Sequence, residues 1–217
     1  MTTTPQERKP DFYYEGDRED MLKFVPADAK VILEVGCGEG NFAYALKRRN
    51  NAEVWGMELD PVAGHRAEQQ LDRVFVGDAA LLAKQLPDRY FDAVVFNDVL
   101  EHMEDPYSLL DYVKGKLKPG GVVVSSIPNI RYFRALIEII WHGQWRYTDY
   151  GTFDKTHLRF FTRKSIADMY RDAGYRVLRM EGTRASKSIR PFLLNVLFLG
   201  KLSDSKYLQF ATVATPA

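Results

Sequence analysis

Short apolar segments alternate with helix-like segments along most of the chain. Residues 31–35 form an apolar run that is too short for a helix and ends at glycines, whereas residues 41–49 place Phe42, Ala45 and Leu46 on one helical face. Further strand-like runs cover residues 53–57, 74–76, 91–97 and 122–127, with helix-like runs at 63–71, 80–85 and 107–117. Because strands that alternate with helices pair in parallel, the pattern predicts an α/β fold with helices on both faces of the sheet.

The alternation stops at residue 128 and resumes at residue 164. The interval 128–162 holds nine of the 28 aromatic residues. Beyond it the pattern predicts a helix at 164–173, a strand at 176–181, an apolar segment at 191–200 and a last strand at 207–213. A length of 217 residues suits one domain, so we expect residues 1–217 to form a single domain with a flexible segment at 1–15 and an insertion or lid at 128–162.

Composition excludes several classes of protein. The single cysteine, Cys37, allows neither an internal disulfide nor a cysteine-based zinc site, and we expect a cytoplasmic protein in which Cys37 is a packing residue. The longest apolar stretches are far shorter than the roughly 20 residues that cross a bilayer, so we expect no membrane insertion. The net charge of +1 argues against a nucleic-acid partner. It conceals a split, because residues 1–127 carry seven excess acidic groups and residues 128–217 carry eight excess basic groups.

The first strand-like run ends in a glycine-rich loop, EVGCGEGN, at residues 34–41. Glycines let the backbone approach a ligand closely at the carboxyl end of a parallel strand, where open α/β sheets bind ligands. The loop lacks the third glycine of a dinucleotide fingerprint and the Gly-Lys-Ser/Thr of a phosphate loop. Glu34 and Glu39 flank the loop, and carboxylates repel phosphates but attract cations. The sequence therefore favours a ligand that carries a cationic group.

Two further acidic residues close the neighbouring strands. Glu58 stands 18 residues after Gly40, where a carboxylate can accept hydrogen bonds from two ribose hydroxyls. Asp78 closes the third strand and suits the exocyclic amine of an adenine. Taken singly, each of these acidic residues is also explained as a solvent-exposed loop residue. Three acids at consecutive strand ends beside a glycine loop favour a single nucleoside site.

Together these motifs resemble the class I S-adenosylmethionine-dependent methyltransferases. The similarity covers residues 30–128 and lies in EVGCGEG at 34–40, VWGMELDP at 54–61, VGDA at 76–79, FDAVVFNDVLEH at 91–102 and LKPGG at 117–121. It implies a Rossmann-like, doubly wound, mostly parallel sheet of seven strands with an antiparallel last strand. It also implies S-adenosyl-L-methionine as the cofactor.

The resemblance assigns roles in donor binding. Glu34 and the loop glycines would hold the methionine portion, Glu58 the ribose, and Asp78 with Ala79 the adenine, while the backbone of Asn97 would contact the amino group. The cofactor-binding residues that we expect are Glu34, Gly36, Gly38, Gly40, Glu58, Leu59, Asp78, Ala79 and Asn97.

The region after the fifth strand carries a second resemblance. SIPN at 126–129, GQWRY at 143–147 and DKTHLRFFT at 154–162 are similar to a methyltransferase subgroup associated with surface-glycan and related biosynthesis. This resemblance says more about lineage than about the acceptor. We expect a small-molecule acceptor, with molecules related to glycans or nucleotide sugars as candidates.

Two histidines are candidates for a general base. His102 follows the fourth strand and His157 lies in the motif KTHLR. An imidazole is the side chain best suited to take a hydroxyl proton near neutral pH, although either ring can instead bond a backbone carbonyl in a structural role. We expect no metal, because a helix start at Pro106 and an acidic surface explain the nearby carboxylates of Asp98, Glu101, Glu104 and Asp105.

The aromatic insertion supplies the candidate acceptor-binding residues. Aromatic rings offer flat faces to a ring, and guanidinium groups bind phosphate or carboxylate through two hydrogen bonds. We expect an anionic, ring-containing acceptor, although packing of the aromatic side chains and ion pairs with Asp149 or Asp154 are alternatives. The proposed contacts are Trp145, Tyr147, Arg146 and Arg159.

The features above predict a methyltransferase that acts on an oxygen or nitrogen of a small acceptor, such as a sugar on a nucleotide or lipid carrier. One alternative is a quinol or small-metabolite O-methyltransferase. Another is a non-catalytic S-adenosylmethionine-binding module that uses the aromatic insertion as a protein interface, and a homodimer is compatible with the same surface.

Overall fold

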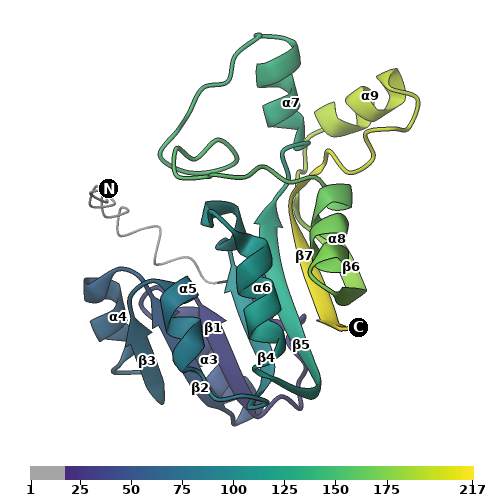
Figure 1. Cartoon of the computed structure of the whole chain (residues 1–217). Coiled ribbons are helices and arrows are strands. Elements are labelled where there is room, and N and C mark those ends of the chain that lie inside the picture. Colours follow the sequence, from purple (N-terminus) through teal and green to yellow (C-terminus); the bar gives the residue numbers. More distant parts are fainter. Residues whose placement is uncertain (1–17) are drawn as a thin grey trace.

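A seven-stranded sheet with helices on both faces forms the centre of the computed structural model, which describes residues 18–217 (Figure 1). The expected flexible segment 1–15 lies outside the described residues. The strands are β1 (Val31–Val35), β2 (Glu53–Glu58), β3 (Arg73–Val76), β4 (Phe91–Asn97), β5 (Leu117–Pro128), β6 (Tyr175–Ala185) and β7 (Tyr207–Pro216). The α-helices are α2 (Glu19–Leu22), α3 (Asn41–Asn50), α4 (Pro61–Ala67), α5 (Ala79–Leu82), α6 (Pro106–Lys114), α7 (Phe133–Ile140), α8 (Arg163–Asp172) and α9 (Arg190–Leu197), with short 3₁₀ helices η1 (Ala83–Gln85) and η2 (Leu100–His102).

The strands are arranged in the order β3-β2-β1-β4-β5-β7-β6. Strand β1 lies at the centre of the parallel part and pairs with β2 and β4. Strand β7 enters between β5 and β6 and is antiparallel to both. The Rossmann-like, doubly wound sheet with an antiparallel last strand is therefore confirmed.

Apolar side chains alternate between the two faces of the sheet. Ile32 and Val95 face one core together with Phe42 of α3, whereas Leu33 and Phe96 face the other core, which α6 and α8 cover. All five side chains are buried, and each buried aliphatic or aromatic side chain contributes about 1.5–3 kcal/mol relative to exposure. Burial on both faces explains why the strands read as continuous apolar runs.

Side-chain caps fix where several helices begin. Asp60 accepts hydrogen bonds from the backbone of the first turn of α4, and Asp105 does the same for α6, where Pro106 is the first helical residue. Thr162 and Ser165 form a reciprocal capping box at the start of α8. The expected helix start at Pro106 is confirmed.

One feature differs from the sequence expectations. Strand β5 begins at Leu117 rather than at residue 122, because Leu117 pairs with Phe91 across a register shift. Helix α7 buries Phe133, whereas Ile140 at its end is 62% exposed. Helices α7 and α9 contact each other and project together from one end of the molecule (Figure 1).

Within residues 18–217, no helix combines the length and the apolar character needed to cross a membrane.

Gly56 on β2 tests the packing beneath the glycine loop. A Cβ at this position would lie 2.6 Å from Sγ of Cys37 and 2.9 Å from Cδ1 of Leu71. We expect Gly56→Ala to lower the free energy of unfolding by about 1–3 kcal/mol through overpacking, and Cys37→Ala in the same chain to restore part of that loss. Urea unfolding measures both, with Gly115→Ala as a control because its Cβ would meet only a carbonyl oxygen at 3.7 Å. Equal stability of Gly56→Ala and the native chain would contradict this packing.

Candidate active site

The carboxyl ends of the parallel strands bring the expected donor residues to one edge of the sheet. Glu34 lies near the end of β1, Glu58 ends β2 and Asn97 ends β4, and Asp78 follows β3. The register places Val35 opposite Met57 on β2 and opposite Phe96 on β4, so these ends lie level with one another. Open α/β sheets bind ligands at this edge.

The glycine loop is attached to β2 by its own backbone. The amides of Gly36 and Cys37 donate to the carbonyl of Met57 at 2.8 and 3.0 Å, and the amide of Gly38 donates to Oε2 of Glu58 at 2.7 Å. Gly36 has a φ of +72°, and a Cβ there would lie 2.5 Å from Cγ2 of Val99. Only glycine fits this position without strain or displacement of Val99.

Glu34 is the central electrostatic feature of this edge. Its side chain is 2% exposed, and Nδ2 of Asn97 donates to its Oε1 at 3.0 Å. Burial raises the pKa of Glu34 to about 8, against the opposing effects of Asn97 and the charge of Arg18. Within residues 18–217, neither Oε2 of Glu34 nor Oδ1 of Asn97 has a hydrogen-bond partner. Two buried acceptors at one place require a donor or a cation.

Glu58 and Asp78 take part in local hydrogen bonds. Besides the Gly38 amide, Glu58 accepts from the amide of Asp60 at 2.9 Å, and burial raises its pKa. Asp78 is exposed and caps the first turn of α5 by accepting from the amide of Ala80 at 2.7 Å. Leu59 is 56% exposed beside them.

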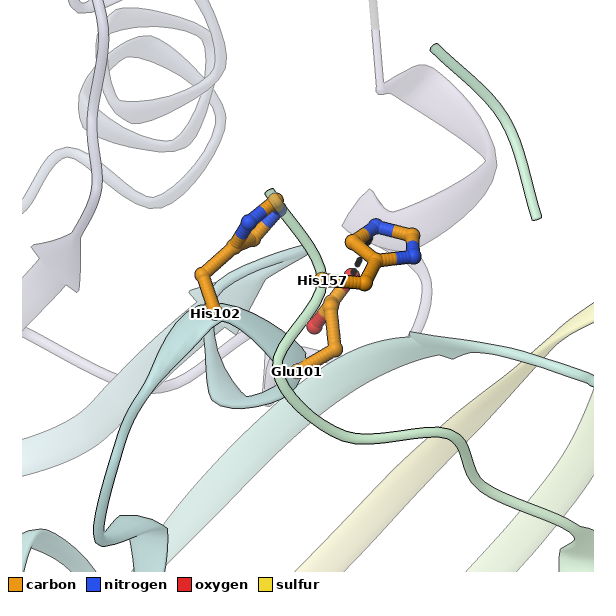
Figure 2. A group of neighbouring side chains, drawn as sticks. All are labelled: Glu101, His102 and His157. Atoms are coloured by element: carbon orange, nitrogen blue, oxygen red, sulfur yellow. Dashed lines mark ion pairs between the residues drawn. The ribbon is translucent and has the colours of Figure 1, made fainter. Parts of the chain in front are cut away.

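Both candidate bases lie in one cluster with Glu101 (Figure 2). The rings of His102 and His157 are 4.7 Å apart between centroids, and Nε2 of His157 is 4.0 Å from Oε1 of Glu101. Glu101 is 1% exposed, neither carboxylate oxygen has a hydrogen-bond partner among residues 18–217, and burial raises its pKa to about 8. One ligand atom from each of the three residues lies within 4.8 Å of the others, which is also the composition of a divalent-cation site.

The hydrogen bonds of each histidine define its tautomer. Nδ1 of His102 lies 3.0 Å from the carbonyl oxygen of Thr156, and Nδ1 of His157 lies 3.2 Å from the carbonyl oxygen of Thr152. A carbonyl only accepts, so in the neutral form Nδ1 carries the proton and Nε2 carries the lone pair. His157 is 8% exposed, whereas His102 is half-buried at the end of η2. His102 is therefore the more accessible of the two.

The aromatic insertion contains an aromatic cluster built around Trp145. The ring of Trp145 contacts those of Phe153 and Phe160 at centroid distances of 4.9 and 4.8 Å, although Trp145 itself is 41% exposed. Tyr147 and Arg146 are exposed beside it. Two isolated bridges inside the insertion pair Asn129 with Phe161 and Thr148 with Asp154. The amides of Leu158 and Arg159 donate to the carbonyl of Glu101 and link the insertion to η2.

Several basic groups of the insertion already have protein partners. Arg131 forms an ion pair with Asp204 at 3.2 Å, and Lys155 forms one with Asp149 at 3.1 Å. Nη2 of Arg159 donates to the carbonyl of Glu104. The pairing of Lys155 with Asp149 is the alternative that the sequence left open for these charges.

One polar network at this edge could not be seen in the sequence. Arg18, on the segment before α2, forms an ion pair with Asp98, and Nε2 of Gln209 on β7 donates to Oδ1 of Asp98 at 2.7 Å. Oγ of Ser126 donates to Oε1 of Gln209 at 3.2 Å. The four residues come from distant parts of the chain, and no local motif links them.

Cys37 lies inside the glycine loop as a packing residue. It is 7% exposed, and burial together with the charges of Glu34 and Glu58 raises the pKa of its thiol well above the usual range. The thiolate form is therefore suppressed, and the thiol is unsuited to nucleophilic chemistry.

Comparisons with known proteins agree with this geometry. Residues 14–180 match a family model described as a methyltransferase domain. The ubiquinone biosynthesis O-methyltransferase of Aeromonas salmonicida is 32% identical over 187 residues, which cover 82% of this chain and 74% of that protein. The chain therefore belongs to the methyltransferase domain family.

Solved structures share the fold. A SAM-dependent methyltransferase from Archaeoglobus fulgidus aligns with a TM-score of 0.68 at 19% identity, over 93% of this chain and 96% of that chain. The magnesium protoporphyrin IX methyltransferase of Synechocystis PCC 6803 with bound SAH aligns with a TM-score of 0.62 at 14% identity, over 92% and 81%. This chain is thus a methyltransferase, and the structural neighbour from Archaeoglobus fulgidus is described as dependent on S-adenosylmethionine.

The residues at the strand ends fit this cofactor. The orphaned acceptors on Glu34 and Asn97 match a ligand with an ammonium group. Glu58 offers a partly buried carboxylate for hydroxyl donors. When bound, S-adenosylmethionine supplies an electrophilic methyl group on a sulfonium.

Replacement of Glu58 tests the donor site. We expect Glu58→Ala to weaken donor binding by roughly 1.5–3 kcal/mol, the range for hydrogen bonds to a charged group, because the variant loses ribose contacts and the support of Gly38. Titration calorimetry with S-adenosylmethionine measures the change. Glu68→Ala is a matched control, since its carboxylate is exposed on the segment after α4. Unchanged donor affinity in a folded Glu58→Ala protein would show that this carboxylate does not hold the ribose.

The raised pKa of Glu34 predicts how stability depends on pH. Between the ordinary value of 4.5 and about 8, the folded chain retains a proton that the unfolded chain has lost, so stability falls as pH rises through this window. For the donor-free enzyme we expect Tm to drop by more than about 2 °C between pH 5 and pH 9, and the drop to be smaller in Glu34→Gln. Thermal unfolding across this range, with Glu68→Gln as the control, measures the effect. Parallel curves for Glu34→Gln and the control would contradict it.

Proposed function

We propose that this enzyme methylates a hydroxyl oxygen on a ring-containing small molecule, with His102 as the general base. The observation that carries the proposal is the hydrogen-bonded state of His102. Its Nδ1 faces two oxygens of Thr156, the carbonyl at 3.0 Å and Oγ1 at 3.1 Å. In this tautomer Nε2 carries the lone pair and is the atom that would take the hydroxyl proton.

A buried carboxylate fixes the partner of His102. Oγ1 of Thr156 donates to Oδ1 of Asp154 at 2.7 Å, and the amide of Thr156 donates to the same oxygen at 2.9 Å. Asp154 is 2% exposed. Because the Thr156 hydroxyl gives its proton to Asp154, it can only accept from His102. The chain Asp154–Thr156–His102 therefore favours one tautomer and one ring orientation.

The donor residues retain the roles that the resemblance implies. Glu34 and Asn97 would bind the ammonium end, Glu58 the ribose, and Asp78 with Ala79 the adenine, while Gly36, Gly38, Gly40 and Leu59 would line the same site. Alignment of the acceptor oxygen with the methyl carbon would provide most of the rate, because a fixed geometry removes an entropic barrier.

A quinol-type ring is the acceptor that the observations favour. Arg131, Lys155 and Arg159 are engaged by protein groups, which leaves fewer cations for a phosphate than the sequence suggested. The Trp145 cluster offers aromatic faces, and the relative from Aeromonas salmonicida is named for an O-methylation step in ubiquinone biosynthesis. The insertion at 128–162 would act as the acceptor-side lid.

An anionic sugar is the second candidate. Arg146 is exposed beside Trp145 and forms no ion pair within residues 18–217. A guanidinium next to an aromatic ring suits a sugar that carries a phosphate, and it fits the resemblance to the glycan-associated subgroup.

A direct assay distinguishes a quinol acceptor from an anionic sugar. We expect mass spectrometry to detect one added methyl group on a catechol or quinol acceptor, and His102→Ala to lower kcat by about 10²–10⁴-fold while donor affinity is unchanged. His142→Ala is the matched control, because His142 is exposed in the same insertion. Activity should survive EDTA, since the base is a side chain.

Other outcomes would change the proposed acceptor or the proposed role of His102. Methylation of nucleotide sugars but not of quinols would select the second candidate. Full activity of His102→Ala would exclude His102 as the base, and loss of activity in EDTA that Zn²⁺ or Mn²⁺ restores would assign Glu101, His102 and His157 to a cation.

A further inference from the structure

Helix α9 turns its apolar face toward solvent. Phe192, Leu193, Val196 and Leu197 recur at helical spacing on one side and are 61, 57, 58 and 74% exposed. The turn that follows adds Leu199, which is 88% exposed. A helix on the surface of a monomer normally turns this stripe inward, so the stripe on α9 requires a partner.

The opposite side of α9 is held against the protein by polar contacts. Pro191 is buried, and Oδ1 of Asn195 accepts from the amide of Leu202 at 3.0 Å. Arg131 donates to the carbonyl of Lys201 and pairs with Asp204. The apolar stripe lies on the side of α9 away from the buried Pro191.

Helix α7 extends this surface. The two helices contact each other at the same end of the molecule (Figure 1). At the end of α7, Ile140 is 62% and Trp141 84% exposed. We call these two residues and the exposed stripe of α9 the α7–α9 surface.

Cations border the α7–α9 surface. Lys187 and Arg190 precede the stripe, Lys201 follows it, and all three are exposed and form no ion pair within residues 18–217. Lys201 also lines a hollow with Arg163 and Lys164. The acid of that hollow, Asp204, is engaged by Arg131. The border is therefore positive.

We propose that the α7–α9 surface docks the enzyme on an anionic lipid membrane. Apolar side chains would enter the boundary between headgroups and acyl chains, while the bordering cations would neutralise lipid phosphates. An exposed tryptophan at the rim suits that boundary, where one side of the ring is apolar and the other is wet. Helix α9 has eight residues, so it lies on the membrane and does not cross it.

Charge separates this partner from a second copy of the chain. A two-fold dimer through the α7–α9 surface would bring the same basic border against itself, because both subunits use one patch. Like charges at a close interface oppose association, whereas an anionic lipid surface attracts every one of them. The proposal does not depend on the identity of the acceptor.

Vesicle flotation tests the docking. We expect the enzyme to float with vesicles of phosphatidylcholine and phosphatidylglycerol, and less with phosphatidylcholine alone or at high salt. Leu193→Ser with Leu197→Ser should reduce the partition coefficient at least about tenfold. The matched control is Val62→Ser with Leu81→Ser, which are 45 and 63% exposed on α4 and α5.

A charge-reversed pair tests the border separately. Arg190→Glu with Lys201→Glu should remove the preference for phosphatidylglycerol, whereas Arg48→Glu with Lys84→Glu, exposed on α3 and η1, should retain it. Absence of flotation for the native enzyme would overturn the proposal, as would equal flotation of the Leu193/Leu197 variant. If light scattering without lipid shows a dimer that the Leu193/Leu197 variant dissociates, the surface binds a second copy of the chain instead. Methyl transfer is assayed apart from these measurements, so either proposal can fail alone.

Discussion

The burial of Glu34 at the tip of the central strand is the constraint on which the donor side of the molecule depends. Parallel pairing with β2 and β4 removes its carboxylate from water, and the Asn97 amide satisfies only one oxygen. A buried charge without a full set of partners is costly, so the empty protein keeps this carboxyl protonated through a raised pKa. A cationic ligand beside Glu34 would remove that cost, so the affinity of this position for a cation follows from the fold.

The same constraint explains why the sequence locates these polar residues at one edge of the sheet. Carboxyl ends of parallel strands meet at one edge, so a residue that ends an apolar run is placed by local pattern alone. Glu34, Glu58, Asp78 and Asn97 all stand at such positions. The contact of Glu58 with the Gly38 amide adds a detail that spacing could not show, since it joins two strand ends through the glycine loop.

The acceptor side was less predictable for a physical reason. Its contacts join segments that are far apart in sequence, such as Glu101 with His157 and Asp98 with Gln209. Periodicity locates a helix and its apolar stripe, but it does not reveal whether that stripe faces the core. The apolar segment at 191–200 looks identical in both cases, and only the structure shows that α9 turns it outward. Ion pairing of the insertion's basic residues is likewise a property of the tertiary fold.

The contacts show where the acidic and basic parts of the sequence lie in the structure. The first 127 positions hold the excess acidic residues, among them the carboxylates at the strand ends, and the excess positive charge lies in the remaining chain. Within that remainder, Arg131 and Lys155 are paired, whereas Lys187, Arg190 and Lys201 border the α7–α9 surface. Because charges of opposite sign are separated, the molecule has a preferred orientation in the field of an anionic membrane. The field would therefore turn α7 and α9 toward the lipid before any apolar side chain makes contact, and docking would begin from an already oriented encounter.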